Sequence, residues 1–149
     1  KELPGAALRF PLCLKGEGGR QIVRTILGID EATKSMTFAG DVPEGTVIQL
    51  MRSNSEKLVD GAKGAAVYSM QSKQPSNTPS LGIIVSCVGR KIILSNRIEE
   101  EVEVVAEIFG SKTSLAGFYS YGEISPLKPF SNCELHNQTM TITCLDELD

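Results

Sequence analysis

The sequence predicts an α+β fold, with a mainly antiparallel or mixed sheet and two principal helices packed on it. Short strand-like runs separated by turns fill the first third of the chain, and two later segments repeat apolar residues at helical spacing. A chain of 149 residues fits one domain at the usual ~100–200 residues per domain. We therefore expect residues 1–149 to form a single domain.

The first third predicts an antiparallel meander. Its expected strands are 8–14, 22–30, 35–38 and 46–51. The glycine-rich stretches 16–19 and 40–45 are typical of turns, because glycine readily supplies a positive φ. Residues 31–33 connect the middle two strands as a hairpin.

A helix is expected next. Ser53 and Glu56 have the spacing of a capping box, whose side chains satisfy the first backbone N–H groups. Apolar residues then follow at helical spacing as far as about Gln71. Gly61 and Gly64 weaken this helix by roughly 1 kcal/mol each relative to alanine, although small residues also permit close packing on a sheet. Residues 72–80 have the composition of a polar linker.

The second half predicts a buried strand at 81–87, then a helix that ends at Gly110. This helix places Ile98, Val102, Val105 and Phe109 on one face. Its acidic residues Glu99, Glu100, Glu101 and Glu103 indicate a solvated face rather than a metal site. The remaining expected elements are a strand at 115–124, a proline-containing loop at 126–129 and a final strand at 134–145.

Composition excludes several classes of protein. The net charge is −3 and the basic residues are dispersed, which argues against nucleic acid as the main partner. No run approaches the ~18 apolar residues of a membrane span, and no secretory leader is visible in a chain that begins at Lys1. The four cysteines form no C-x-x-C pair and one histidine is present, so we expect no metal, no cofactor and reduced thiols in a cytoplasmic protein. The sequon at 137–139 is then a chance match.

Strand periodicity divides the final strand into two faces. His136 and Gln138 share a face with Met140, Ile142 and Cys144, whereas Asn137 points the other way with the threonines. The apolar members indicate a core-directed face. Burying His136 and Gln138 without partners would cost on the order of 1–3 kcal/mol each, so either internal groups or a ligand must pair with them.

Two further groups of residues are candidates for binding. Tyr119, Tyr121 and Glu123 share a face of the preceding strand, and two tyrosines suit a polar small ligand, although cross-strand packing with a surface glutamate explains them equally. Cys87, Gly89 and Arg90 lie at a strand-to-helix junction. Exposed N–H groups and Arg90 could hold a carboxylate or phosphate there. Cys87 is either a thiol of lowered pKa or an inert buried cysteine.

Three separated motifs resemble one known family. They are CVGRK at 87–91, an acidic helix at 97–110, and a C-terminal signature made of GFYSYGEI at 117–124 followed by LHNQTMT at 135–141. In this order they resemble the FIST C domain, the C-terminal half of an intracellular sensory module whose N-terminal half is absent here. The resemblance implies a small ligand such as an amino acid. It also implies an N-terminal FIST domain and a bacterial signalling output, or an F-box in eukaryotic relatives, as partners.

We therefore expect a non-catalytic sensory domain in intracellular signal transduction. For an amino acid, Arg90 would bind the carboxylate and Glu123 the ammonium group. The candidate ligand-binding residues are Cys87, Gly89, Arg90, Tyr119, Tyr121, Glu123, His136, Asn137 and Gln138. The alternatives are a hydrolase or transferase using Cys87 with His136 as base, and a protein-interaction scaffold.

Overall fold

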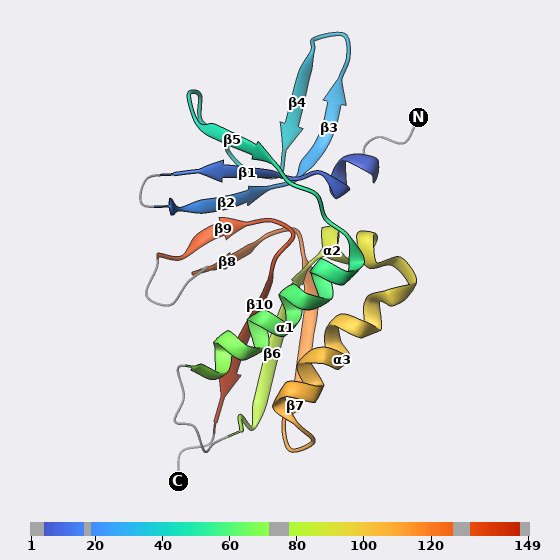
Figure 1. The fold of residues 1–149 in the computed structure, drawn as a ribbon, viewed down its shortest axis with the longest axis vertical. Helices are drawn as coiled ribbons and strands as arrows, with labels where there is room; N and C mark the ends of the chain where they lie inside the picture. Colours follow the sequence, from blue (N-terminus) through green and yellow to red (C-terminus); the bar gives the residue numbers. More distant parts are fainter. Residues whose placement is uncertain (1–4, 17–18, 72–77, 127–131, 147–149) are drawn as a thin grey trace.

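The computed structural model describes residues 5–16, 19–71, 78–126 and 132–146, and it has the predicted α+β architecture (Figure 1). The strands are β1 (Leu12–Lys15), β2 (Gln21–Arg24), β3 (Ile26–Asp30), β4 (Ser35–Phe38), β5 (Val47–Leu50), β6 (Leu81–Cys87), β7 (Ser114–Ser120), β8 (Glu123–Ser125), β9 (Glu134–His136) and β10 (Met140–Leu145). The α-helices are α1 (Ser55–Gln71), α2 (Val88–Leu94) and α3 (Ile98–Phe109), with 3₁₀ turns η1 (Gly5–Arg9) and η3 (Ser95–Arg97). The predicted turn at 16–19, linker at 72–80 and loop at 126–129 lie partly outside the described residues.

The first third of the chain is the predicted antiparallel arrangement. β1 is the central strand of a three-stranded sheet of order β2-β1-β5, and it is antiparallel to both neighbours. β3 and β4 form a separate hairpin that projects away from the rest of the molecule (Figure 1). The antiparallel pairing and the hairpin of 35–38 with the strand before it are confirmed. The prediction of a meander is wrong, because β5 pairs with β1 rather than with β4, and the predicted strand 22–30 is divided into β2 and β3, which lie in different sheets. The predicted strand 8–14 begins at Leu12, after η1.

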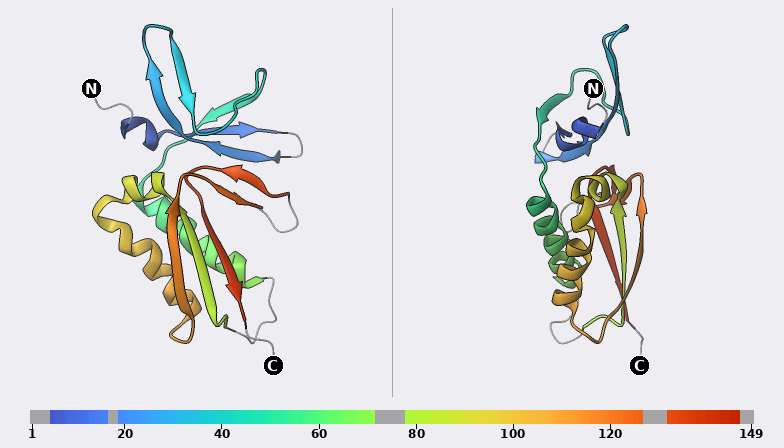
Figure 2. Two further views of the ribbon diagram at one scale, coloured as in Figure 1. Left: turned by 180° about the vertical axis from the view of Figure 1, so that it is seen from behind. Right: turned by 90° about the vertical axis from the view of Figure 1, so that its right-hand side faces the viewer.

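The second half forms a sheet of order β10-β6-β7, in which β6 is antiparallel to β10 and parallel to β7. α1 and α3 both cover the same face of this sheet (Figure 2). The core between them is closely packed and apolar. Its buried members are Ala62, Ala66, Ile84, Val105, Phe109 and Met140. The two long helices therefore pack on the sheet as predicted, with α2 as a short additional helix.

The β8–β9 hairpin connects the two halves, lying beside β2 on one side and above β10 on the other (Figure 1). Asn137 donates its backbone N–H to the carbonyl of Val23 at 3.2 Å. The Arg24 guanidinium donates to the carbonyl of Leu135 at 2.7 Å and to that of Asp41 at 3.0 Å. The two halves are thus held together by hydrogen bonds between buried or half-buried groups.

The start of α1 and the buried face of α3 differ from the prediction. α1 is capped by Asn54, whose side-chain oxygen accepts the N–H of Lys57 at 2.9 Å, so the predicted capping box is wrong. On α3 the buried face includes Glu101, whereas Val102 is 41% exposed. The prediction that all four acidic residues of this helix are solvated is therefore wrong for Glu101.

Neither of the last two predicted strands is continuous. The run at 115–124 is interrupted at Tyr121 and Gly122, and the run at 134–145 is interrupted between His136 and Met140. Gln138 has a φ of 56°, a left-handed conformation that no strand continues through. The predicted division into two faces fails there, and Asn137 is buried together with His136 and Gln138.

No helix within the described ranges is long and apolar enough to cross a membrane.

Candidate ligand-binding groove

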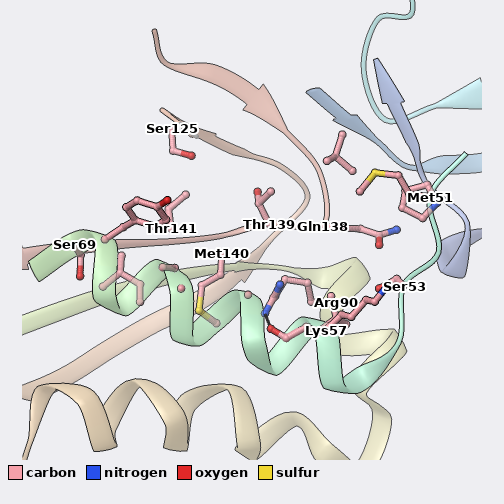
Figure 3. A pocket seen from close by; sticks show the side chains of 18 of the residues that line it. Met51, Ser53, Lys57, Ser69, Arg90, Ser125, Gln138, Thr139, Met140 and Thr141 are labelled. Carbon is pink, nitrogen blue, oxygen red and sulfur yellow. Dashed lines mark hydrogen bonds between the residues drawn. The ribbon is translucent and has the colours of Figure 1, made fainter. Parts of the chain in front are cut away.

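A groove of about 1030 Å³ runs between α1, β10 and the segment that joins β5 to α1 (Figure 3). The lining includes Met51, Arg52, Ser53, Lys57, Gly61, Gly64, Ala65, Arg90, Gln138, Thr139, Met140, Thr141 and Ile142. Its volume lies at the upper end of the ~300–1,000 Å³ of small-molecule sites. Such a groove is large enough for a ligand of appreciable size.

The charge of the groove has one sign. Arg52, Lys57 and Arg90 line it, and none of the lining residues that the structure describes is an aspartate or glutamate, although the chain as a whole carries a net charge of −3. All three cations lie near the start of α1. Arg90 is already paired with an acid, so Arg52 and Lys57 supply the uncompensated positive charge. This end of the groove favours an anionic group.

Gln138 lines the groove and carries a buried side-chain acceptor that has no partner among the described residues. Its side-chain nitrogen donates to the carbonyl of Leu8 at 2.7 Å, which fixes the amide in place. Its Oε1 is buried and has no hydrogen-bond partner, while the residue as a whole is 8% exposed. An unpaired buried acceptor costs about 1–3 kcal/mol, and the left-handed φ adds strain. Unpaired groups and backbone strain of this kind cluster at binding sites.

Arg90 and Glu101 form a buried ion pair beneath the groove. The Nε and Nη2 atoms of Arg90 lie 3.0 and 2.9 Å from Glu101 Oε2, and Nη2 also donates to the carbonyl of Leu58 at 2.7 Å. The other carboxylate oxygen of Glu101 accepts from Ser86 at 3.1 Å and from Tyr119 at 2.8 Å. The sequence predicted that Arg90 would bind the carboxylate of a ligand, but in the structure its guanidinium is paired with the carboxylate of Glu101.

The two tyrosines do not form one wall. The Tyr119 hydroxyl is engaged by Glu101, and burial together with that carboxylate raises the pKa of Tyr119. The ammonium group of Lys91 lies 4.9 Å from the centre of the Tyr119 ring, at cation–π distance. Tyr121 lies in the turn after β7 and is 87% exposed. The prediction that both tyrosines face one site is wrong, because the strand ends between them.

Glu123 and Cys87 lie in a second buried cluster. Glu123 accepts from the hydroxyls of Ser120 at 2.6 Å and Thr139 at 2.8 Å, so it is not the surface residue of the alternative interpretation. Burial is the main cause that raises the pKa of the Cys87 thiol, and the nearby Glu123 raises it further. The backbone N–H groups of Gln138 and Gly89 lower it, but the net shift is upward. A thiol in this setting stays protonated and is a poor nucleophile.

His136 is buried opposite Glu123 in the β8–β9 hairpin, and among the described residues neither of its ring nitrogens makes a hydrogen bond of normal geometry, although the Ser125 backbone lies close enough to influence it. Burial lowers its pKa, while the Ser125 backbone and Glu134 act in the opposite direction. Asn137 is satisfied internally: its side-chain oxygen accepts the N–H of Thr25 at 3.3 Å, and its side-chain nitrogen donates to the carbonyl of Tyr121 at 3.4 Å.

Of the nine predicted residues, only Arg90 and Gln138 line the groove. Gly89 lies behind Gln138, since a Cβ there would come within 3.1 Å of the glutamine Cγ. The other six belong to the buried clusters or, for Tyr121, to the surface. Three kinds of groove residue were not predicted from the sequence: Arg52, Lys57 and the threonines of the lining. The signal that could have found the groove was the pair Gly61 and Gly64, glycines retained in a helix that they weaken.

The described residues contain no group of three or more histidine, cysteine, aspartate or glutamate side chains placed to hold a metal ion.

Comparison with known proteins gives one match. Neither curated proteins nor solved structures match the chain. The profile of the FIST C domain matches residues 1–126, more than four-fifths of the chain, and stops short of the motif at 135–141. Members of this family are sensory domains of signal transduction. The chain therefore belongs to the FIST C domain family.

Proposed function

We propose that this FIST C domain senses a small anionic ligand that binds in the groove between α1 and β10. The observation that carries the proposal is the buried Oε1 of Gln138, which has no partner among the described residues, in a groove whose described charged residues are all cations. A ligand that brings an N–H or O–H donor to this oxygen would remove the cost of the unpaired acceptor.

An amino acid is the simplest ligand with the required groups. Its carboxylate would lie near Arg52 and Lys57, and its nitrogen would donate to Gln138. Glu123, the predicted partner of the ammonium group, is buried behind β10 with its oxygens held by Ser120 and Thr139. Within the lining of the groove a neutral acceptor takes its place, so the site requires a donor rather than a positive charge.

The sensory proposal is non-catalytic. The alternative of a cysteine hydrolase needs a thiolate at Cys87 and a base beside it. Burial instead raises the pKa of this thiol, and His136 is not among the groups that influence it. The charges that influence His136 are those of Glu134, Arg24 and Arg20, and Cys87 is not among the groups that influence it.

The test is a thermal-shift screen of the 149-residue chain against amino acids and small metabolites, followed by calorimetry of the compounds that shift melting. Gln138→Leu removes the free acceptor and should weaken binding by about tenfold, whereas Gln49→Leu, an exposed glutamine outside the groove, should leave binding unchanged. Cys87→Ser should bind like the parent. If no compound gives saturable binding, or if Gln138→Leu binds normally, the groove is not the sensory site.

A second candidate, a protein-interaction scaffold, is favoured by the exposed surface. No helix among the described residues covers the other face of the β10-β6-β7 sheet (Figure 2), and Phe118 of β7 is 64% exposed. This candidate predicts that no small ligand stabilises the domain, while Phe118→Ser lowers its tendency to associate with partner domains.

A further inference from the structure

We propose that the groove binds a short peptide in extended conformation, added as a fourth strand along the free edge of β10, with its C-terminal carboxylate beside Arg52 and Lys57. This inference rests on the proposed function, because it takes the groove as the ligand site, but it replaces the free amino acid with a peptide.

The edge of β10 that faces the groove has no strand beside it. In the sheet of order β10-β6-β7, β10 is a terminal strand among the described residues. The first three residues of β10, 140–142, line the groove, as do the two residues before them, 138 and 139. Alternate residues would line it if β10 presented a face, so consecutive residues indicate that it presents its edge.

The hydrogen-bonding pattern identifies the free groups on that edge. Thr139 accepts the N–H of Cys87 at 3.0 Å, so its carbonyl is directed towards β6. In an antiparallel pair this direction alternates along the strand. Thr141 therefore bonds to β6, while Met140 and Ile142 direct their backbone N–H and carbonyl groups away from β6 and into the groove. These groups are the template that an added strand needs.

The length of the groove exceeds that of an amino acid. It extends along α1 from Lys57 to Gln71, which at ~1.5 Å per residue is about 21 Å. An extended chain rises ~3.3 Å per residue, so about six peptide residues span this length, and one amino acid fills a small part of it.

The opposite wall permits a close approach of backbone. Gly61, Gly64 and Ala65 line the groove on α1, and no atom lies within 4 Å of the position that a Cβ of Gly64 would occupy. Glycine inside a helix lowers its stability relative to alanine, so its presence here is consistent with a need for space. This wall of α1 and the edge of β10 leave a narrow slot between them, and its width suits the backbone of an extended peptide. The Gln138 oxygen lies at one end of this slot.

Charge and strand direction together set the orientation of the peptide. α1 and β10 run in the same direction along the groove, from Lys57 and Gln138 at one end to Ser69 and Thr141 at the other (Figure 3). A strand antiparallel to β10 would run the opposite way and end beside Lys57, Arg52 and the Gln138 acceptor. Its C-terminal carboxylate would then meet the uncompensated cations of the groove.

The experiment uses a library of N-acetylated hexapeptides with free C-terminal carboxylates, screened against the 149-residue chain beside the free amino acids. The tightest peptide is then made in two altered forms. One carries a C-terminal amide, and the other carries N-methyl groups at alternate residues to remove strand hydrogen bonds. We expect the first to bind at least about fivefold and the second at least about tenfold more weakly. Bound peptide should slow hydrogen exchange at the amides of Met140 and Ile142, but not at Thr141.

Gly64→Leu locates the site. Leucine is a better helix former than glycine, so this variant should fold at least as stably while its side chain fills the slot and abolishes peptide binding. Val67→Leu, on an exposed part of α1 outside the groove, is the matched control and should bind normally.

The outcomes separate the two proposals. If free amino acids bind and no peptide does, the peptide inference fails and the sensory proposal stands. If neither binds, both fail. If the N-methylated peptide or Gly64→Leu binds like the parent, the peptide does not occupy the edge of β10 and the inference is overturned.

Discussion

Replacing Glu101 by alanine would remove one half of the buried ion pair on α3. Glu101 is 0% exposed, and its carboxylate holds four contacts of 2.8–3.1 Å, two of them to the Arg90 guanidinium. Alanine would leave that guanidinium buried with only the carbonyl of Leu58 as a partner. Breaking a buried pair on one side costs about 3–5 kcal/mol. We expect such a loss, a large part of the ~5–15 kcal/mol that stabilises a typical domain.

Urea denaturation followed by circular dichroism measures this loss, and the melting temperature should fall by about 6–20 °C. Glu103→Ala is the matched control, because Glu103 is an exposed residue of the same helix and should change stability by less than about 0.5 kcal/mol. The double variant Arg90→Met with Glu101→Leu should recover most of the loss, since it leaves no buried charge unpaired. A Glu101→Ala variant as stable as Glu103→Ala would show that the pair is not buried in solution.

Further predictions concern the glycine of β7, the histidine and the thiols. Gly117→Ala should destabilise by more than about 2 kcal/mol in urea denaturation, because its Cβ would clash with the backbone carbonyl of Ile84 in β6, whereas Gly28→Ala, with open space, should be nearly neutral. Burial holds the pKa of His136 below 6.5, so as the pH drops through 6.5 the unfolded chain binds a proton that the folded chain does not, and the free energy of unfolding should fall. Urea midpoints measured over a series of pH values should show this fall, and His136→Phe should remove it. An alkylating reagent should modify the exposed Cys133 well before Cys87, and equal rates by mass spectrometry would contradict the burial of Cys87.

Local patterns predicted the elements well. The periodicity of α1, the buried run of β6 and the stop at Gly110, whose φ is 79°, depend on neighbouring residues and were recoverable from sequence. The capping prediction failed by one residue, because Asn54 competes with Ser53 for the same role and both side chains can accept the N–H groups.

The candidate site was less predictable, because it depends on contacts between distant residues. Glu101 is buried only because Arg90, Ser86 and Tyr119 converge on it from three other elements, and no spacing within α3 indicates this. The break before β10 depends on a left-handed Gln138, a residue type that strand periodicity treats like any other. Because the chain turns at Gln138, the alternation of side chains along a strand does not place His136 and Met140 on the same face.

The position of β10 has a consequence for how the chain reaches its fold. This strand lies entirely beyond residue 126, where the family match stops, yet it pairs with β6 along six residues and contributes Met140 to the core. The hydrogen bond from Arg24 to Leu135 likewise joins residues 111 apart. Closing such long loops is slow, because the entropy lost on closure is not offset until the contacts between the distant segments form. A ribosome must therefore release nearly the whole chain before its central sheet is complete, and an expression fragment cut at residue 126 would lack the strand that closes the core.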